Sequence, residues 1–268
     1  MVVPHLNPDF VTPIRPILTP LVAVLGPVEI HNARELAEPS KRGQLTALAA
    51  YLALHPGQSR DSVDEAMWPG SRVTLATRNT AMTKLRNWLG ADPDGNDYLP
   101  RADTDGYRLH PAIRTDWRMF TELLPNGPAR ASTADLIAAM DLVRDQPFKG
   151  VNPRRYVWAE RIQQEMTAAI GDVAAELARR ALLAEDHRLA LKAVMTGLTA
   201  EPGSEMLWRY RLRAHHAAGD RVALRQAADQ LTALADELGG DLEDETTELL
   251  QQLLKSATRP AVTSRRTR

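Results

Sequence analysis

The chain of 268 residues is long enough for two domains, each with a buried core of its own. It contains no cysteine, which excludes disulfide bonds, cysteine-ligated zinc sites and thiol catalysis. No apolar run reaches the roughly 18 residues of a membrane span, and residues 1–20 lack the apolar centre of a signal peptide. We therefore expect these 268 residues to be soluble and cytoplasmic and to make no contact with a membrane.

The net charge of −1 is unevenly distributed along the chain. Residues 21–115 carry 11 basic and 11 acidic residues, whereas residues 116–254 carry 16 basic and 22 acidic ones. Neutrality over the first region argues against strong DNA affinity, because neutralisation of phosphates supplies most non-specific binding. Within that region, however, residues 71–90 contain four basic residues and no acidic one.

The first hundred residues show signals for a proline-rich lead-in, two strands and three helices. Five prolines make residues 1–20 an extended linker, and residues 21–26 and 28–31 are predicted to be short strands. The predicted helices are Gln44–Leu54, a helix capped by Ser59 and ending at Met67, and Thr74–Leu89, which Gly90 closes.

A hairpin is predicted after the third helix. Tyr98-Leu99 and Tyr107–Leu109 are expected to pair across Asp105-Gly106, a dipeptide that favours tight turns between strands. Two strands, three helices and a terminal hairpin predict a winged helix-turn-helix domain over residues 21–115.

From Thr115 onward the pattern is helical. The predicted helices are Asp116–Leu124, Ser132–Val143, Tyr156–Leu183, His187–Thr199, Glu205–Ala218, Arg221–Leu238 and Leu242–Lys255. The later connections are only two to four residues long, which places consecutive helices antiparallel. We therefore predict a mainly α fold: a winged helix-turn-helix (α+β), then an all-α tetratricopeptide-like helical repeat domain over 116–255, and a disordered basic tail over 256–268.

Several segments carry a resemblance to a known family. They are LVAVLGPVEI (21–30), TKLRNWLG (83–90), DGYRL (105–109), DWRMF (116–120), VWAER (157–161) and the long run from Glu201 to Gly239. In this order they resemble the bacterial transcriptional activator domain family, found in actinobacterial antibiotic regulatory proteins. The resemblance implies an OmpR-type winged helix before a tetratricopeptide-like domain. It also implies a DNA-binding transcriptional regulator, homodimerisation, and contact of the helical domain with a partner such as RNA polymerase.

The third helix supplies the candidate contacts to double-stranded DNA. At about 100° per residue, Leu75, Met82, Leu85 and Leu89 fall on one side. The opposite side carries Thr77, Thr80, Thr83, Lys84 and Asn87, residue types that hydrogen-bond base edges in the major groove. Arg72, Arg86 and Arg101 are predicted to bind the flanking phosphates. A solvated helix face remains the alternative. Arg78, near the apolar stripe, is expected to pair with a carboxylate or to cap a strand end rather than to read DNA.

Other functions are weighed against this reading. No GxxxxGK[ST], GxGxxG or GxSxG element is present, so we expect no enzyme, no catalytic residue and no cofactor. The aspartates between residues 92 and 105 are expected to form turns rather than a metal site, and to repel DNA. In Trp208–Arg213 we expect a packed tryptophan with a solvated basic face.

Two alternatives stay open. One is a protein-interaction scaffold that does not bind DNA and forms part of a longer membrane-associated protein; the neutral charge and the acidic wing favour it. The other is a small-ligand or nucleotide sensor, which a pocket lined by arginines between the two domains would favour.

Overall fold

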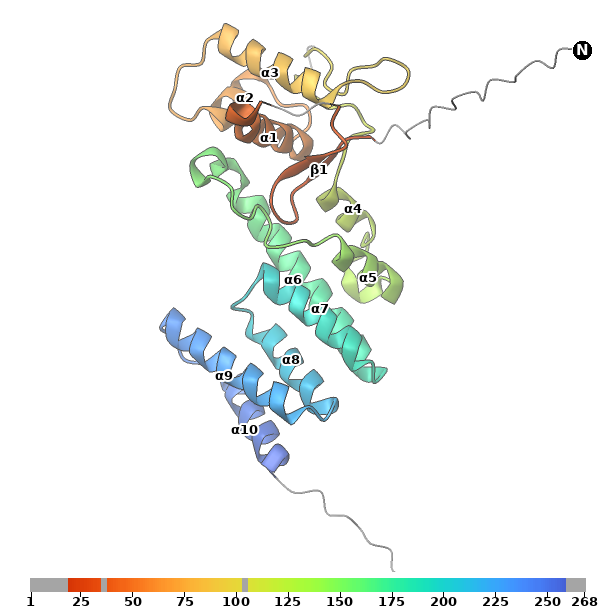
Figure 1. Ribbon diagram of the computed structural model, residues 1–268, viewed down its shortest axis with the longest axis vertical. Coiled ribbons are helices and arrows are strands. Elements are labelled where there is room, and N and C mark those ends of the chain that lie inside the picture. Colours follow the sequence, from red (N-terminus) through yellow and green to blue (C-terminus); the bar gives the residue numbers. More distant parts are fainter. Residues whose placement is uncertain (1–18, 35–37, 103–105, 259–268) are drawn as a thin grey trace, which may run out of the picture.

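The computed structural model describes residues 19–34, 38–102 and 106–258, and the side chains of these up to residue 255. This part of the chain forms ten α-helices and a three-stranded sheet, arranged in an elongated molecule with α3 near one end and α10 near the other (Figure 1). The mainly helical fold with a small sheet is the predicted one. No helix within the described ranges is both long and apolar enough to cross a membrane.

The sheet brings together the beginning and the end of residues 21–115, which we call the first region. Strands β1 (Leu21–Ala23) and β2 (Glu29–His31) form within the two predicted strand segments and pair antiparallel, with Val22 opposite Ile30. Strand β3 (Arg114–Thr115), which the sequence pattern did not indicate, pairs parallel with β1 and gives the order β2-β1-β3. The chain therefore returns to its first strand before it enters the helical region.

Three helices follow in this region: α1 (Pro39–Leu54), which packs against the sheet, and α2 (Arg60–Met67) and α3 (Leu75–Leu89), which pack against α1. Helix α1 begins five residues before the predicted start, because Pro39 occupies the first turn, where proline's missing N–H costs nothing. The Ser59 side chain caps α2 as predicted by accepting a hydrogen bond from the Ser62 backbone N–H at 3.1 Å. The three helices bury Leu48, Val63 and Leu85 in a common core.

The hairpin predicted after α3 is wrong in its pairing. Tyr107 forms an antiparallel bridge with Gln58, from the loop before α2, instead of pairing with Tyr98. Tyr98 receives one hydrogen bond, from the His110 N–H at 2.9 Å. We call residues 91–109 the wing loop; Asp105 of the predicted turn lies outside the described residues. The Tyr107 backbone N–H donates to the Gln58 carbonyl at 2.8 Å. The partner lies 49 residues earlier in the chain, so a local sequence pattern could not predict this pairing.

The helical region begins with short elements and continues as stacked helices. Its helices are α4 (Asp116–Glu122), α5 (Thr133–Asp141), α6 (Glu160–Leu183), α7 (His187–Ala200), α8 (Glu205–Ala217), α9 (Arg221–Leu238) and α10 (Asp244–Thr258). The 3-10 turns η1 (Pro128–Arg130), η2 (Pro153–Arg155) and η3 (Val157–Ala159) lie between them, so α6 starts four residues after its predicted beginning. Helices α6, α7 and α8 pack closely at Gly197, where a Cβ atom would lie 2.6 Å from the Ala174 Cβ.

The Trp208–Arg213 segment is part of this packing. Trp208 is buried and donates its Nε1–H to the Pro202 carbonyl at 2.8 Å, as expected for a packed tryptophan. Arg211 stacks over its ring at 4.8 Å. Arg209, however, is buried and forms an ion pair with Glu243 at 2.5 Å, so the expected solvated basic face is partly wrong.

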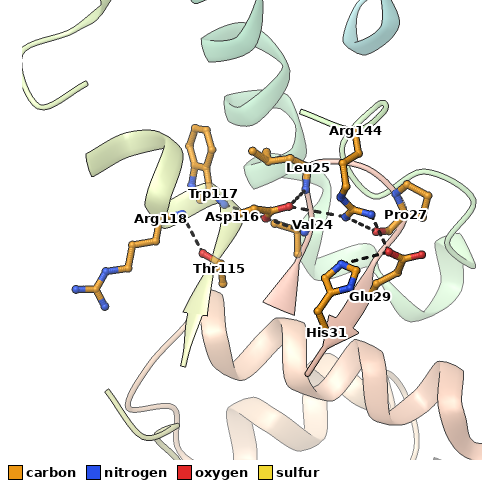
Figure 2. Close-up of polar contacts among 10 residues, drawn as sticks. All are labelled: Val24, Leu25, Pro27, Glu29, His31, Thr115, Asp116, Trp117, Arg118 and Arg144. Carbon is orange, nitrogen blue, oxygen red and sulfur yellow. Dashed lines mark hydrogen bonds and ion pairs between the residues drawn. The ribbon is translucent and has the colours of Figure 1, made fainter. Parts of the chain in front are cut away.

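The two regions share one continuous hydrophobic core. At their junction the backbone N–H groups of Val24 and Leu25 donate to Asp116 at the start of α4 (Figure 2). Arg144 reaches back to Glu29, at 2.8 Å, and to the Pro27 carbonyl. The first strand and its turn are thus hydrogen-bonded into the helical region.

Candidate nucleic-acid interface

Helix α3 is delimited by side-chain and backbone signals of its own. The Thr74 hydroxyl accepts a hydrogen bond from the Thr77 N–H at 3.2 Å, and Gly90, with φ of 79°, ends the helix. The predicted inward side chains Met82, Leu85 and Leu89 are buried. Leu75 was also predicted to be buried, but it is 60% exposed because the first residue of the helix lies beyond the edge of the core.

Arg78 anchors α3 to α2. Its guanidinium forms an ion pair and a hydrogen bond with Asp64 of α2, and only 8% of the residue is exposed. Of the two roles expected for Arg78, pairing with a carboxylate is the one that the structure shows. The pair thus links α3 to α2 on the side of α3 that is turned away from solvent.

The opposite side of α3 is open to solvent. Its exposed residues are Thr77, Thr80, Thr83, Lys84 and Asn87. The Thr80 hydroxyl donates to the Ala76 carbonyl at 2.8 Å, which leaves its lone pairs available as acceptors. Lys84 lies 3.4 Å from Glu38 in an exposed ion pair. Such pairs contribute roughly 0–1 kcal/mol, so a phosphate could replace the carboxylate at small cost.

Grooves run along both flanks of α3. One, of about 340 Å³, lies between α3 and the first turns of α1, with Lys41, Gln44 and Lys84 on its walls. The other, of about 480 Å³, lies between α3 and the wing loop, and its described lining is Arg60, Leu75, Asn79, Met82, Thr83, Arg86, Arg101, Ala102 and Tyr107. The second groove therefore contains three arginines and no acidic residue among its described lining.

Besides Arg78, four arginines on α3 or in the segments around it take different positions. Arg86 donates its Nε–H to the Leu99 carbonyl at 2.7 Å and lies 3.5 Å from Asp97, so it holds the wing loop against the helix. Arg72 is exposed in the loop before α3, and Arg101 is exposed in the wing loop. Sequence reasoning missed Arg60; its position directly after the capping Ser59 could have placed it at an exposed helix start.

The aspartates of the wing loop form a turn where they are described. Asp92 accepts hydrogen bonds from the backbone N–H groups of Asp94 and Asn96, and from the Asn96 side chain at 3.0 Å. The Asn96 side-chain hydrogen bond is the main cause that lowers the pKa of Asp92. The turn-forming role is confirmed for this residue, whereas Asp103 and Asp105 lie outside the described residues. Within the described chain, no group of three or more His, Asp or Glu side chains is arranged to hold a metal ion.

The order of elements defines a class: a winged helix joined to stacked helical hairpins, the architecture of a transcriptional regulator. Residues 115–254 match the family model of the bacterial transcriptional activator domain. The chain belongs to this family, as the sequence resemblance predicts.

A solved structure has the same fold. The structure of EmbR from Mycobacterium tuberculosis in complex with a low-affinity phosphopeptide superposes with a TM-score of 0.62 over 90% of this chain. The two sequences are 19% identical, and the chain corresponds to 66% of the length of that structure. The comparison with curated protein sequences found no match.

Proposed function

We propose that the chain is a sequence-specific DNA-binding transcriptional regulator, with a winged helix-turn-helix domain over residues 21–115 and a helical partner domain over 116–255. The observation that carries the proposal is the exposed face of α3, whose five predicted polar residues are all open to solvent. A solvent-facing helix of this kind fits the major groove of B-form DNA.

The residues divide into base-reading and phosphate-binding groups. Thr77, Thr80, Thr83, Lys84 and Asn87 read base edges, since threonine, lysine and asparagine each present donors or acceptors there. Arg72 and Arg101 bind phosphates, joined by Arg60 in the groove beside the wing loop. Arg86 contributes mainly by positioning the wing loop, because its Nε–H is engaged by the Leu99 carbonyl.

The helical region is proposed to contact another protein, either a second copy of the chain or RNA polymerase. Its excess of acidic residues, 22 against 16 basic ones over residues 116–254, supports such a role. The phosphopeptide in the EmbR structure is a ligand of that protein, and no residue described here is assigned to it.

The test is selection of duplexes from a random pool by the full chain, followed by fluorescence anisotropy at two salt concentrations. Lys84→Ala and Asn87→Ala are compared with Arg225→Ala, an exposed arginine on α9, far along the chain from α3. We expect a selected sequence, an affinity that falls as salt rises, and a loss of about tenfold for each α3 variant alone.

Binding no tighter than about 0.1 mM for every duplex, the weak end of non-specific affinity, would overturn the proposal. The winged helix would then be a protein-interaction surface within a scaffold. An equal loss in all three variants would place the DNA contact outside α3.

A further inference from the structure

A third groove lies where the first region meets the helical region, away from the proposed DNA contacts. Its volume is about 450 Å³. The described lining comes from the β1–β2 turn, the start of α1 and the segment 149–156: Pro27, Val28, Pro39, Arg42, Gly43, Thr46, Lys149, Gly150, Val151, Asn152, Arg155 and Tyr156. Three of these residues are basic and none is acidic.

The three cations have little compensation from described residues. Arg42 and Arg155 form no ion pair with any residue that the structure describes. Lys149 lies 3.7 Å from Asp145, in a pair that is largely exposed and therefore weak. A Cβ atom at Gly43 would lie 3.3 Å from the Arg155 Nη1, so the guanidinium of the helical region rests directly over α1. Like charges brought together in this way attract an anion.

The start of α1 adds few backbone donors to this groove. Pro39 has no N–H, and the N–H groups of Lys41 and Arg42 both donate to the Glu38 carbonyl at 2.9 Å. The positive charge of the groove therefore comes from its basic side chains.

The groove faces away from α3. On α1, Lys41, Gln44 and Leu45 line the groove beside α3, whereas Arg42, Gly43 and Thr46 line this one. At 100° per residue the two sets point about 150° apart on the helix. DNA bound along α3 would therefore not enter this groove, and a small ligand fits it better.

We propose that the groove binds an organic phosphate, a small molecule that carries its phosphate on an apolar or planar group. The phosphate lies between Arg42 and Arg155, since guanidinium groups bind phosphate oxygens with paired hydrogen bonds. The apolar group packs on Val28, Val151 and the buried Tyr156. The bound anion bridges the winged helix and the helical region and removes the repulsion between their cations. This inference goes beyond DNA binding and does not depend on it.

Isothermal titration calorimetry of the full chain without DNA tests the proposal. The probes are adenosine diphosphate, pyrophosphate as the phosphate-only arm, and adenosine as the arm without phosphate. The variants are Arg42→Gln and Arg155→Gln. Arg154→Gln is the matched control, an exposed neighbour of Arg155 that does not line the groove.

We expect saturable binding of adenosine diphosphate, weaker binding of pyrophosphate and none of adenosine. Arg42→Gln and Arg155→Gln should each weaken the Kd by about tenfold, the loss of one charge-assisted hydrogen bond, and Arg154→Gln should leave it unchanged. No saturable binding of either phosphate probe would overturn the proposal, as would equal binding by all variants. Loss of DNA affinity in Arg155→Gln without any binding of the probes would assign the arginine to the DNA backbone instead.

Discussion

The Asp116 carboxylate accepts a 2.8 Å hydrogen bond from the backbone N–H of Val24, a residue 92 positions earlier in the chain. Its second oxygen accepts from the Leu25 N–H at 3.0 Å, and only 3% of Asp116 is exposed (Figure 2). Burial raises the pKa of this carboxyl, and the hydrogen bonds from Val24 and Leu25 oppose the rise. The Asp116 side chain at the start of α4 thus pairs the two backbone N–H groups that follow strand β1. These hydrogen bonds connect the first region of the chain to the helical region.

Asp116→Asn should lower the free energy of unfolding by about 1 kcal/mol. Asparagine avoids the cost of a buried charge, but its NH₂ group faces a backbone N–H donor that is left without an acceptor. Urea unfolding followed by circular dichroism measures the change, with the exposed Asp229→Asn as the control. Identical unfolding midpoints for the two variants would show that the junction does not depend on this carboxylate.

Arg78→Met should lower the free energy of unfolding by about 3 kcal/mol, because it leaves the Asp64 carboxylate partly buried without its partner. Arg72→Met, in the exposed loop before α3, should leave stability unchanged and weaken DNA binding. Chemical unfolding measures stability and fluorescence anisotropy measures DNA affinity for both variants. Arg78→Met should lower stability, whereas Arg72→Met should lower only the DNA affinity. A normal stability of Arg78→Met would contradict the anchoring role.

The features that could be predicted from sequence are those with a local cause. Ser59, Thr74 and Gly90 delimit α2 and α3 through bonds within a few residues, and helical phase correctly assigned the exposed side of α3. The Leu75 error has a local cause too, since phase alone does not say where the core ends along a helix.

The features that could not be predicted depend on distant backbone. The Gln58–Tyr107 bridge and the parallel β1–β3 pair replace the expected hairpin geometry through partners that no sequence window contains. The groove between α1 and the segment 149–156 has the same origin, because its cations come from two regions more than a hundred residues apart. From the sequence, a pocket lined by arginines between the two domains could be given only as one alternative, without naming the residues that form it.

Gly106→Ala should disturb the wing loop more than an ordinary glycine substitution does. A Cβ atom there would lie 2.3 Å from the Gln58 carbonyl oxygen, and φ is +87°. Gly95→Ala is a matched control, because Gly95 has the same φ and nothing within 4 Å of its Cβ position. We expect a loss of about 1 kcal/mol for Gly95→Ala from backbone strain alone and about 3 kcal/mol for Gly106→Ala. Equal losses in denaturant unfolding would show that the Gln58 contact yields without cost.

The ring of His55 packs between the two regions. It lies 5.0 Å from the Tyr51 ring and 5.7 Å from the Trp158 ring, and its Nε2 is buried without a hydrogen-bond partner in the described chain. Burial lowers the pKa of His55 below its ordinary value near 6.5. Below that pH the unfolded chain binds the proton more readily than the folded one, so stability is lost as the pH falls from about 6.5.

His55→Phe should remove this part of the pH dependence while keeping the aromatic packing. Thermal unfolding between about pH 7.5 and pH 5.5 should show a smaller decrease in Tm for His55→Phe than for the unsubstituted chain. His216→Gln, which replaces an exposed histidine on α8 outside this ring cluster, is the control and should follow the unsubstituted chain. Parallel Tm profiles for all three proteins would mean that His55 accepts its proton within the aromatic cluster at no cost, and the junction would then be insensitive to pH at this position.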